Sequence, residues 1–474
     1  MSQRPDDSVR ALFSPVFDYV KNRGLADIIA QSPTLLQRSA DSEAFRNHCE
    51  YHDGAHWRLR PEILYPDPQL AQPEQITIYR NASDESVTIS LSGDDWRKVH
   101  RLIAGLAGQE AMKPDLDSGE RDLISVLSDE RLVAARNTNE SRGSAFDAAD
   151  ITFIGHNTAL IRSPEASVII DPFFCAAGEQ YPSSYQPLTI HDFGKIDAIL
   201  ITHSHPDHFD PASLLQFSTA TRIIVPDISR ETILAVDMAA RLNELGFTNC
   251  ERLAWDQSVR ILDLELHALP FYGEQPTNLG VLHPEIRNYG NTYVVRTPRY
   301  SAAFVADSGR DAAGDVKDVA KEWHRRFGPI DVLFAGYRGW ETYAVQLLFS
   351  SVSRYILFVP SRLWNTRLQL MNNIDNAIDL AEYWGARYLV PYGDGGAPWY
   401  WQIGLGPKLD DQSSEDTAFD PFPERVIERA NLRKRNDSAN ALETILLRPG
   451  ESIGELPGRA SILRVDGHIW PYQM

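Results

Sequence analysis

Residues 197–210 read DAILITHSHPDHFD, a short apolar run followed by a cluster of polar side chains. The run 198–201 is apolar and ends at a polar break, which is typical of a buried β-strand. Four side chains able to bind metal follow with the spacing His-x-His-x-Asp-His, namely His203, His205, Asp207 and His208. Alternate residues of a strand end project the same way, so the two leading histidines can reach one point, and the turn at Pro206 directs the last two toward a second point. Imidazole and carboxylate in this mixture predict a site for zinc, iron or manganese.

The composition is that of a globular protein with a sizeable core. The chain has 474 residues, 43% of them hydrophobic, and 46 basic residues against 65 acidic ones give a net charge of −19. This charge disfavours nucleic acid and anionic membranes as partners. No apolar run approaches the length of a membrane span or resembles a signal peptide, and the cysteines are too few for a disulfide framework. We therefore expect a cytoplasmic protein.

A polar stretch divides the chain into two parts. Residues 136–147, RNTNESRGSAFD, have the composition of a linker. Residues 1–147 mix helical and strand-like patterns, which predicts a smaller α+β domain that serves in homodimerisation or in docking a partner protein. Residues 148–409 are expected to form the main domain, and residues 410–474 a C-terminal extension.

The main domain begins with strand-like hairpins and continues with strands interleaved with helices. Strands are expected at 151–163, 167–174, 259–271, 291–307 and 331–337, and helices at 230–246, 312–327 and 372–385. This order predicts an α/β sandwich with its sheets at the centre.

The histidine motif and the residues before it resemble a known superfamily. Residues 155–174 read GHNTALIRSPEASVIIDPFF, and together with His-x-His-x-Asp-His they are similar to the metallo-β-lactamase fold, an αββα sandwich. The Gly155-His156 opening and the strand end at Asp171-Pro172 resemble the branch of N-acyl-phosphatidylethanolamine phospholipase D and ascorbate-phosphate lactonase. The resemblance covers about residues 150–400. It implies that the first two motif histidines bind one metal ion and that Asp207 and His208 bind a second.

The resemblance also implies a bridging aspartate and two further ligands. Asp307 follows the apolar strand of SAAFVADSGRD (301–311), as the bridging aspartate of the family does. The family places its next histidine after a strand and a proline, but here LELHALPFYGEQP (264–276) has Glu274 at that place, and His267 precedes the proline. We interpret His267 as a core residue or a support for the ligands.

The last family ligand is a histidine in a loop near the end of the domain. The corresponding stretch AEYWGARYLVPYGDGGAPW (381–399) has no histidine, and Asp394 is its substitute or a residue that stabilises its own turn. The expected ligands of the first ion are thus His203, His205, Glu274 and Asp307, and those of the second ion are Asp207, His208, Asp307 and Asp394.

A carboxylate-rich set of this kind is typical of non-haem di-iron centres. The glutamate and the two-domain layout also resemble the di-iron β-hydroxylases of nonribosomal peptide pathways. The first hypothesis is therefore a di-iron oxygenase that takes O2 and electrons from an external donor and hydroxylates a small-molecule or carrier-protein-bound substrate. Tyr272 and Arg310 flank expected ligands and are candidates for orienting the substrate.

Two alternatives remain open. The first is a hydrolase with two zinc or manganese ions that acts on a phosphodiester, lactone or amide through a metal-bound hydroxide. The second is a metal-binding scaffold without turnover, which the complete motif disfavours. The chain has no Gly-x-Gly-x-x-Gly after a strand and no four-cysteine cluster, so the oxygenase hypothesis requires its electrons from outside.

Overall fold

In this computed structural model, the described part of the chain is built around two β-sheets that pack face to face. The structure describes residues 146–174, 188–229, 231, 235–273, 288–339, 371–393, 421–436 and 441–464, and the backbone of 50–52, 57–59, 74–79, 86–91, 121, 124, 125, 128, 341–343 and 367–369. Glu274 and Asp394, two of the expected ligands, lie outside these residues. None of the helices in the described part is long and apolar enough to cross a membrane.

The first sheet contains the strand that precedes the histidine motif. Its described strands have the order β10-β9-β8-β7-β6-β5-β20-β21. Their bounds are β5 (Ile151–Gly155), β6 (Thr158–Arg162), β7 (Ser167–Ile170), β8 (Ala198–Leu200), β9 (Arg222–Pro226), β10 (Cys250–Leu253), β20 (Glu451–Gly454) and β21 (Ser461–Arg464). Strands β7, β8 and β9 are parallel, so their carboxyl ends meet at one edge of the sheet.

The second sheet contains the strand that leads to Asp307. Its order in the described residues is β11-β12-β13-β14-β15-β18-β19. The bounds are β11 (Ser258–Ile261), β12 (Leu264–Pro270), β13 (Asn291–Arg296), β14 (Ser301–Phe304), β15 (Val332–Ala335), β18 (Tyr388–Pro391) and β19 (Glu443–Thr444). Among the described residues, three two-stranded sheets add β1 (Glu50–His52) with β2 (Trp57–Leu59), β3 (Glu74–Tyr79) with β4 (Ser86–Leu91), and β16 (Glu341–Tyr343) with β17 (Arg367–Gln369).

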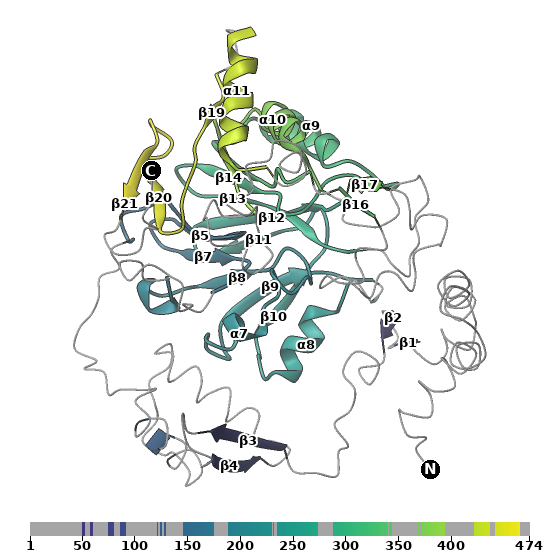
Figure 1. The fold of residues 1–474 in the computed structure, drawn as a ribbon, viewed down its shortest axis with the longest axis vertical. Coiled ribbons are helices and arrows are strands. Elements are labelled where there is room, and N and C mark those ends of the chain that lie inside the picture. The colour runs from purple at the N-terminus through teal and green to yellow at the C-terminus, as the bar shows by residue number, and fades with distance from the viewer. Residues whose placement is uncertain are drawn as a thin grey trace, which may run out of the picture.

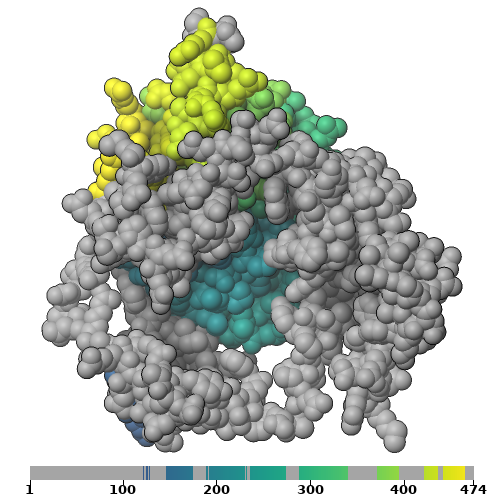
Figure 2. Space-filling model, in the orientation of Figure 1, coloured from purple at the N-terminus to yellow at the C-terminus, as the bar shows by residue number. Residues whose placement is uncertain are grey.

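Helices cover the outer face of each sheet (Figure 1). The first sheet is covered by η1 (Ile190–Asp192), α7 (Pro211–Leu214) and α8 (Met238–Glu244), and the second by α9 (Val316–Phe327), α10 (Ile374–Trp384) and α11 (Glu424–Asn436). In the space-filling view, the yellow C-terminal segments, α11 among them, form one end of the molecule (Figure 2). The predicted αββα sandwich is therefore confirmed.

Strand β8 of the first sheet is apolar at every position because both faces of the sheet are buried there. Ile170 and Leu200 point into the core between the sheets, whereas their neighbours Ile169 and Ile199 point toward the helices α7 and α8. Side chains alternate between the faces of a strand, so a sheet buried on both sides reads as a continuous apolar run. This is why the run 198–201 could be identified as a strand.

Two helices are shorter than the sequence predicted. The helix expected at 230–246 is observed as α8, which begins after Asp237, because the Asp237 side chain accepts a hydrogen bond from the Ala240 N–H. The helix expected at 312–327 begins only at Val316, where Asp315 accepts from Lys317 N–H. In both places an aspartate satisfies the free amide groups of the first turn and so defines the start of the helix.

Candidate metal centre

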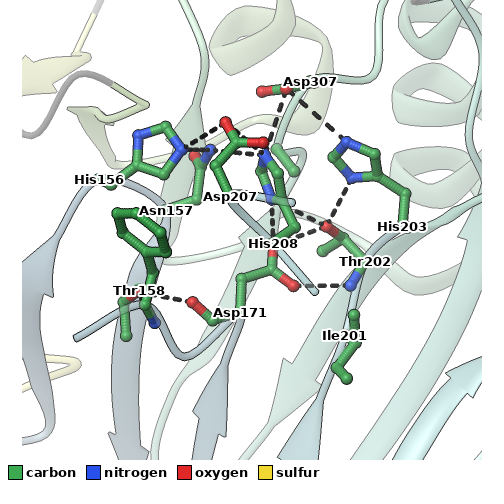
Figure 3. A network of polar contacts seen from close by, with 12 residues as sticks. His156, Asn157, Thr158, Asp171, Ile201, Thr202, His203, Asp207, His208 and Asp307 are labelled. Atoms are coloured by element: carbon green, nitrogen blue, oxygen red, sulfur yellow. Dashed lines mark hydrogen bonds and ion pairs between the residues drawn. The ribbon is translucent and has the colours of Figure 1, made fainter. Parts of the chain in front are cut away.

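The metal-binding side chains gather where strands of both sheets end (Figure 3). The motif follows β8, Asp171 follows the parallel neighbour β7, and Asp307 follows β14 of the second sheet. The backbone of the motif is fixed across the two sheets, since Asn291 N donates to Thr202 O at 2.8 Å. Gly290 is required at this crossing, because a Cβ there would lie 2.7 Å from Thr202 O and 3.0 Å from the His203 Cβ.

His203, His205 and Asp307 form one group that can hold a metal ion. Each offers a ligand atom, these atoms lie within 4.8 Å of one another, and all three residues are buried. The rings of His203 and His205 have centroids 4.6 Å apart, and His203 Nε2 lies 3.8 Å from Asp307 Oδ2. Two ligands about 2.1 Å from one ion are roughly 3.0–3.4 Å apart, so small side-chain shifts would close this set around a cation.

His156, Asp207 and His208 form the second group, again with ligand atoms within 4.8 Å of one another. His156 Nε2 lies 3.1 Å from Asp207 Oδ2, and His208 Nε2 lies 3.7 Å from the same oxygen. Asp207 and His208 were expected together, but sequence reasoning missed His156. His156 supplies a further ligand of the second ion, for which the sequence analysis had proposed only Asp394.

Asp307 lies between the two groups. Its Oδ2 is 3.8 Å from His203 Nε2 and 3.3 Å from His208 Nε2, and its side chain is 8% exposed. One carboxylate is therefore adjacent to a histidine of each group, which is the arrangement expected of a bridging ligand. Both groups fit metal ions by their chemistry, because each contains two imidazoles and one carboxylate.

A buried carboxylate behind the ligands fixes the orientation of two histidines. Asp171 accepts hydrogen bonds from Thr202 N at 2.7 Å and from Thr202 Oγ1 at 2.6 Å, and its Oδ2 is 2.8 Å from His208 Nδ1. Because an ionised carboxylate only accepts, His208 must carry its proton on Nδ1. The Thr202 hydroxyl donates to Asp171, so it accepts from His203 Nδ1 at 3.0 Å. Both histidines thus keep Nε2 free as a lone-pair donor for a metal.

His156 reaches the site from the turn between β5 and β6. Its backbone has a φ of 52°, and its carbonyl accepts a hydrogen bond from Gly393 N at 3.0 Å. In the same turn, Thr158 Oγ1 donates to the carbonyl of Asp171 at 2.6 Å. The turn is therefore attached both to the end of β18 and to the end of β7. The Gly155-His156 pair was the sequence signal, but only the pairing of β5 through β8 brings it beside Asp207.

The carboxylates and histidines of the site shift one another's pKa. Burial favours the neutral form of Asp207, but the neighbouring His208 and His156 outweigh this and hold its pKa well below the ordinary range. Burial acts in the same direction on Asp307, and His208 and His203 lower its pKa to about 2. Burial disfavours the charged form of His208, yet Asp307, Asp207 and Asp171 raise its pKa well above 6.5.

The raised pKa of His208 predicts how the metal-free protein responds to pH. Its proton stabilises the fold fully below the unfolded pKa of 6.5, and this contribution is lost as the pH rises through the higher folded value. We expect the Tm with EDTA to fall as the pH rises above 6.5, while the Tm gain from added Mn(II) grows, since proton and metal compete for Nε2. Thermal unfolding from pH 6 to 9 measures both. The variant His208→Gln should flatten these profiles, and parallel profiles for variant and wild type would contradict the assignment.

The other expected residues are not members of these two groups, or they lie outside the described residues. The half-buried Tyr272 and the exposed Arg310 are neighbours, because Gly309 N donates to Tyr272 O and the backbone of Gly273 packs on that of Arg310. His267 belongs to the packing under α9, where its ring contacts Trp323 with centroids 5.0 Å apart. Glu274 and Asp394 stay predictions.

Comparison with known proteins identifies the domain. Residues 167–392 match the β-lactamase superfamily domain. Two solved structures of a diiron β-hydroxylase, CmlA from Streptomyces venezuelae and a mutant of the same enzyme, have the same fold. The wild-type structure gives a TM-score of 0.55 at 18% identity and covers 81% of this chain and 65% of that chain.

Curated relatives carry two kinds of name. The 4-amino-L-phenylalanyl-(CmlP-peptidyl-carrier-protein) 3-hydroxylase of Streptomyces venezuelae is 27% identical over 190 residues, which are 39% of this chain and 33% of the relative. A UPF0173 metal-dependent hydrolase of Desulforamulus reducens is 33% identical over 75 residues, which are 16% of this chain and 29% of the relative. The chain thus spans a third or less of the length of either relative.

Proposed function

Because residues 167–392 form a β-lactamase superfamily domain, we propose that this chain is a binuclear metal enzyme, and specifically a di-iron oxygenase. Its substrate is a small molecule or a group attached to a carrier protein, and its reaction is hydroxylation. One oxygen atom of O2 enters a C–H or N–H bond and the other leaves as water, so each turnover consumes two protons and two electrons from an external donor.

The observation that carries this proposal is the composition of the two groups. Each group pairs two histidines with one aspartate, namely His203 and His205 with Asp307, and His156 and His208 with Asp207. Two histidines and one carboxylate with open positions are typical of non-haem iron oxygenases. The similarity to a 3-hydroxylase of a carrier-bound amino acid supports the same reaction class.

The residues of the site have separate tasks in this proposal. A pair of ferrous ions would supply the binding positions for O2 and the electrons that reduce it. Asp307 lies next to a histidine of each group and would bridge the two ions. Asp171 keeps two histidines in the tautomer whose Nε2 can bind metal. Arg310, which follows Asp307 closely in the chain, and Tyr272, whose carbonyl accepts from Gly309 N, are proposed to orient the substrate.

A hydrolase is the second candidate, because one relative is named a metal-dependent hydrolase. Two zinc or manganese ions would lower the pKa of a bound water, and the resulting hydroxide would attack a phosphodiester, lactone or amide. The same side chains would hold the ions, so the two candidates differ in the metal and in the need for O2. A scaffold without turnover has less support, since the described part of the chain keeps two groups of metal-binding side chains.

Metal content and O2 uptake separate the two candidates. Purified without added metal, then loaded anaerobically with two equivalents of Fe(II), the protein is expected to develop colour on exposure to air and to consume O2. The zinc-loaded protein is the matched control, and it should stay colourless and consume none. If the protein instead contains zinc as isolated and hydrolyses bis(p-nitrophenyl) phosphate or a lactone without O2, the hydrolase replaces the oxygenase.

A further inference from the structure

Asn157 places its side-chain amide inside the second metal-binding group. It follows His156 in the turn between β5 and β6, and the residue is 0% exposed. Its Nδ2 lies 3.3 Å from His156 Nε2 and 3.3 Å from His208 Nε2 (Figure 3). These are the nitrogen atoms that the tautomers leave free for a metal, at least for His208, whose Nδ1 is engaged by Asp171. The amide head therefore occupies a ligand position of the group.

The spacing of these atoms is that of ligands around one ion. Two atoms bound to the same cation at about 2.1 Å are roughly 3.0–3.4 Å apart, and the Asn157 amide atom meets this distance to both histidines. Asp207 Oδ2, at 3.1 Å from His156 Nε2, meets it as well. Four side chains thus surround one point.

In the structure, Asn157 directs its nitrogen toward the point between these side chains. A cation at that point would require the amide oxygen instead. The structure places Asn157 Nδ2, an N–H donor, toward Nε2 of both histidines. A cation between the imidazoles would be repelled by the same N–H groups. Rotation of the amide by 180° exchanges nitrogen and oxygen at almost no steric cost, because the two atoms are nearly equal in size.

The oxygen of Asn157 has no competing hydrogen bond among the described residues. Oδ1 is buried and without a hydrogen-bond partner in that part of the chain. It faces Gly393, where even an added Cβ would lie 3.7 Å away. Rotation of the amide therefore breaks no hydrogen bond between Oδ1 and the described residues, and it brings Oδ1 next to the cation.

We propose that Asn157 is a ligand of the second metal ion through Oδ1, with its amide rotated relative to the metal-free state. Amide oxygen is a suitable ligand for hard divalent cations, and it completes the set of His156, Asp207 and His208 without adding charge. The inference rests on the second metal position proposed above, but it does not depend on which reaction the pair performs.

Metal binding to the full chain tests the proposal with Mn(II) as the probe. The wild type is expected to bind two ions, measured by the electron paramagnetic resonance of free Mn(II). Asn157→Leu, which keeps the branched shape of the side chain but has no oxygen, should weaken the second ion by about 10-fold to 100-fold. Asn157→Asp, which keeps an oxygen and loses the N–H groups, should bind the second ion as tightly as the wild type or more tightly.

Three controls make the result decisive. Ser452→Ala removes another buried polar group, a hydroxyl of β20 that donates to Thr152 Oγ1, and it should leave both affinities unchanged. Asp207→Ala should lose the second ion, and if it does while Asn157→Leu binds like the wild type, only the assignment of Asn157 is wrong. Weakening by Asn157→Asp equal to that by Asn157→Leu would also overturn it, in favour of a hydrogen-bonding role. If Asn157→Leu does not fold, the aspartate variant alone decides.

Discussion

Replacing Asp307 by alanine is expected to weaken both metal ions at once and to lower turnover by on the order of 10³-fold or more. Its Oδ2 is the one carboxylate atom found near a histidine of each described group, at 3.8 Å from His203 and 3.3 Å from His208. A metal ion contributes several kcal/mol to transition-state stabilisation, and each 1.36 kcal/mol is a factor of about ten in rate. Loss of the carboxylate also removes the described ligand atom that lies next to both groups.

The comparison with single-group variants separates a bridging ligand from an ordinary one. His205→Ala and Asp207→Ala should each release one ion, whereas Asp307→Ala should reduce the occupancy of both, as metal analysis after dialysis will measure. Asp315→Ala is the matched control, because this nearby aspartate caps α9 and should cost about 1 kcal/mol of stability with two ions retained. Loss of only one ion from Asp307→Ala would contradict the bridging position.

The part of the site that lies close together in sequence could be predicted from the sequence. His203, His205, Asp207 and His208 all follow one apolar strand, so local periodicity was sufficient to place them. Asp307 was identified from the family resemblance, with the apolar strand β14 shortly before it as the local signal. A buried strand followed by polar residues can be recognised from the local sequence, without knowledge of the rest of the fold.

The contribution of His156 could not be predicted in this way. It is 51 residues before Asp207, and their proximity depends on the register of β5 with β6, β6 with β7, and β7 with β8. The ladder between Ser452 and Thr152 spans 300 residues, and local periodicity likewise gave no indication that β20 would join the first sheet. Such pairings are selected by the packing of the whole sheet, which one strand does not encode.

The substitution Asp171→Asn is expected to remove metal from the site while nearly preserving its shape. Thr202 N donates to Asp171 Oδ1, so the asparagine must keep its oxygen there and turn its NH2 group toward His208 Nδ1. His208 then has to accept at Nδ1 and carry its proton on Nε2, the atom that faces the metal. The same NH2 group also faces the Thr202 hydroxyl, which thereby loses its acceptor at residue 171. The hydroxyl then donates to His203 Nδ1 instead of accepting from it. Exchanging one oxygen of Asp171 for an NH2 group thus reverses the tautomer that His208 and His203 need to bind metal through Nε2.

We expect this variant to lose metal affinity by about 10-fold to 100-fold for each ion, because outer partners of metal-bound histidines have effects of this size. Nitrogen NMR of the metal-free protein labelled at histidine, recorded above the raised pKa of His208, will report the tautomer of its neutral ring, and a Mn(II) titration will report the affinity. Asp150→Asn is the matched control, since this buried aspartate pairs with Arg299 and accepts from Leu456 N, away from the histidines. It should lower stability without changing metal binding. If Asp171→Asn instead binds both ions normally with His208 still protonated on Nδ1, the carboxylate supports the fold alone, and the orientation of the histidines must come from the strand ends themselves.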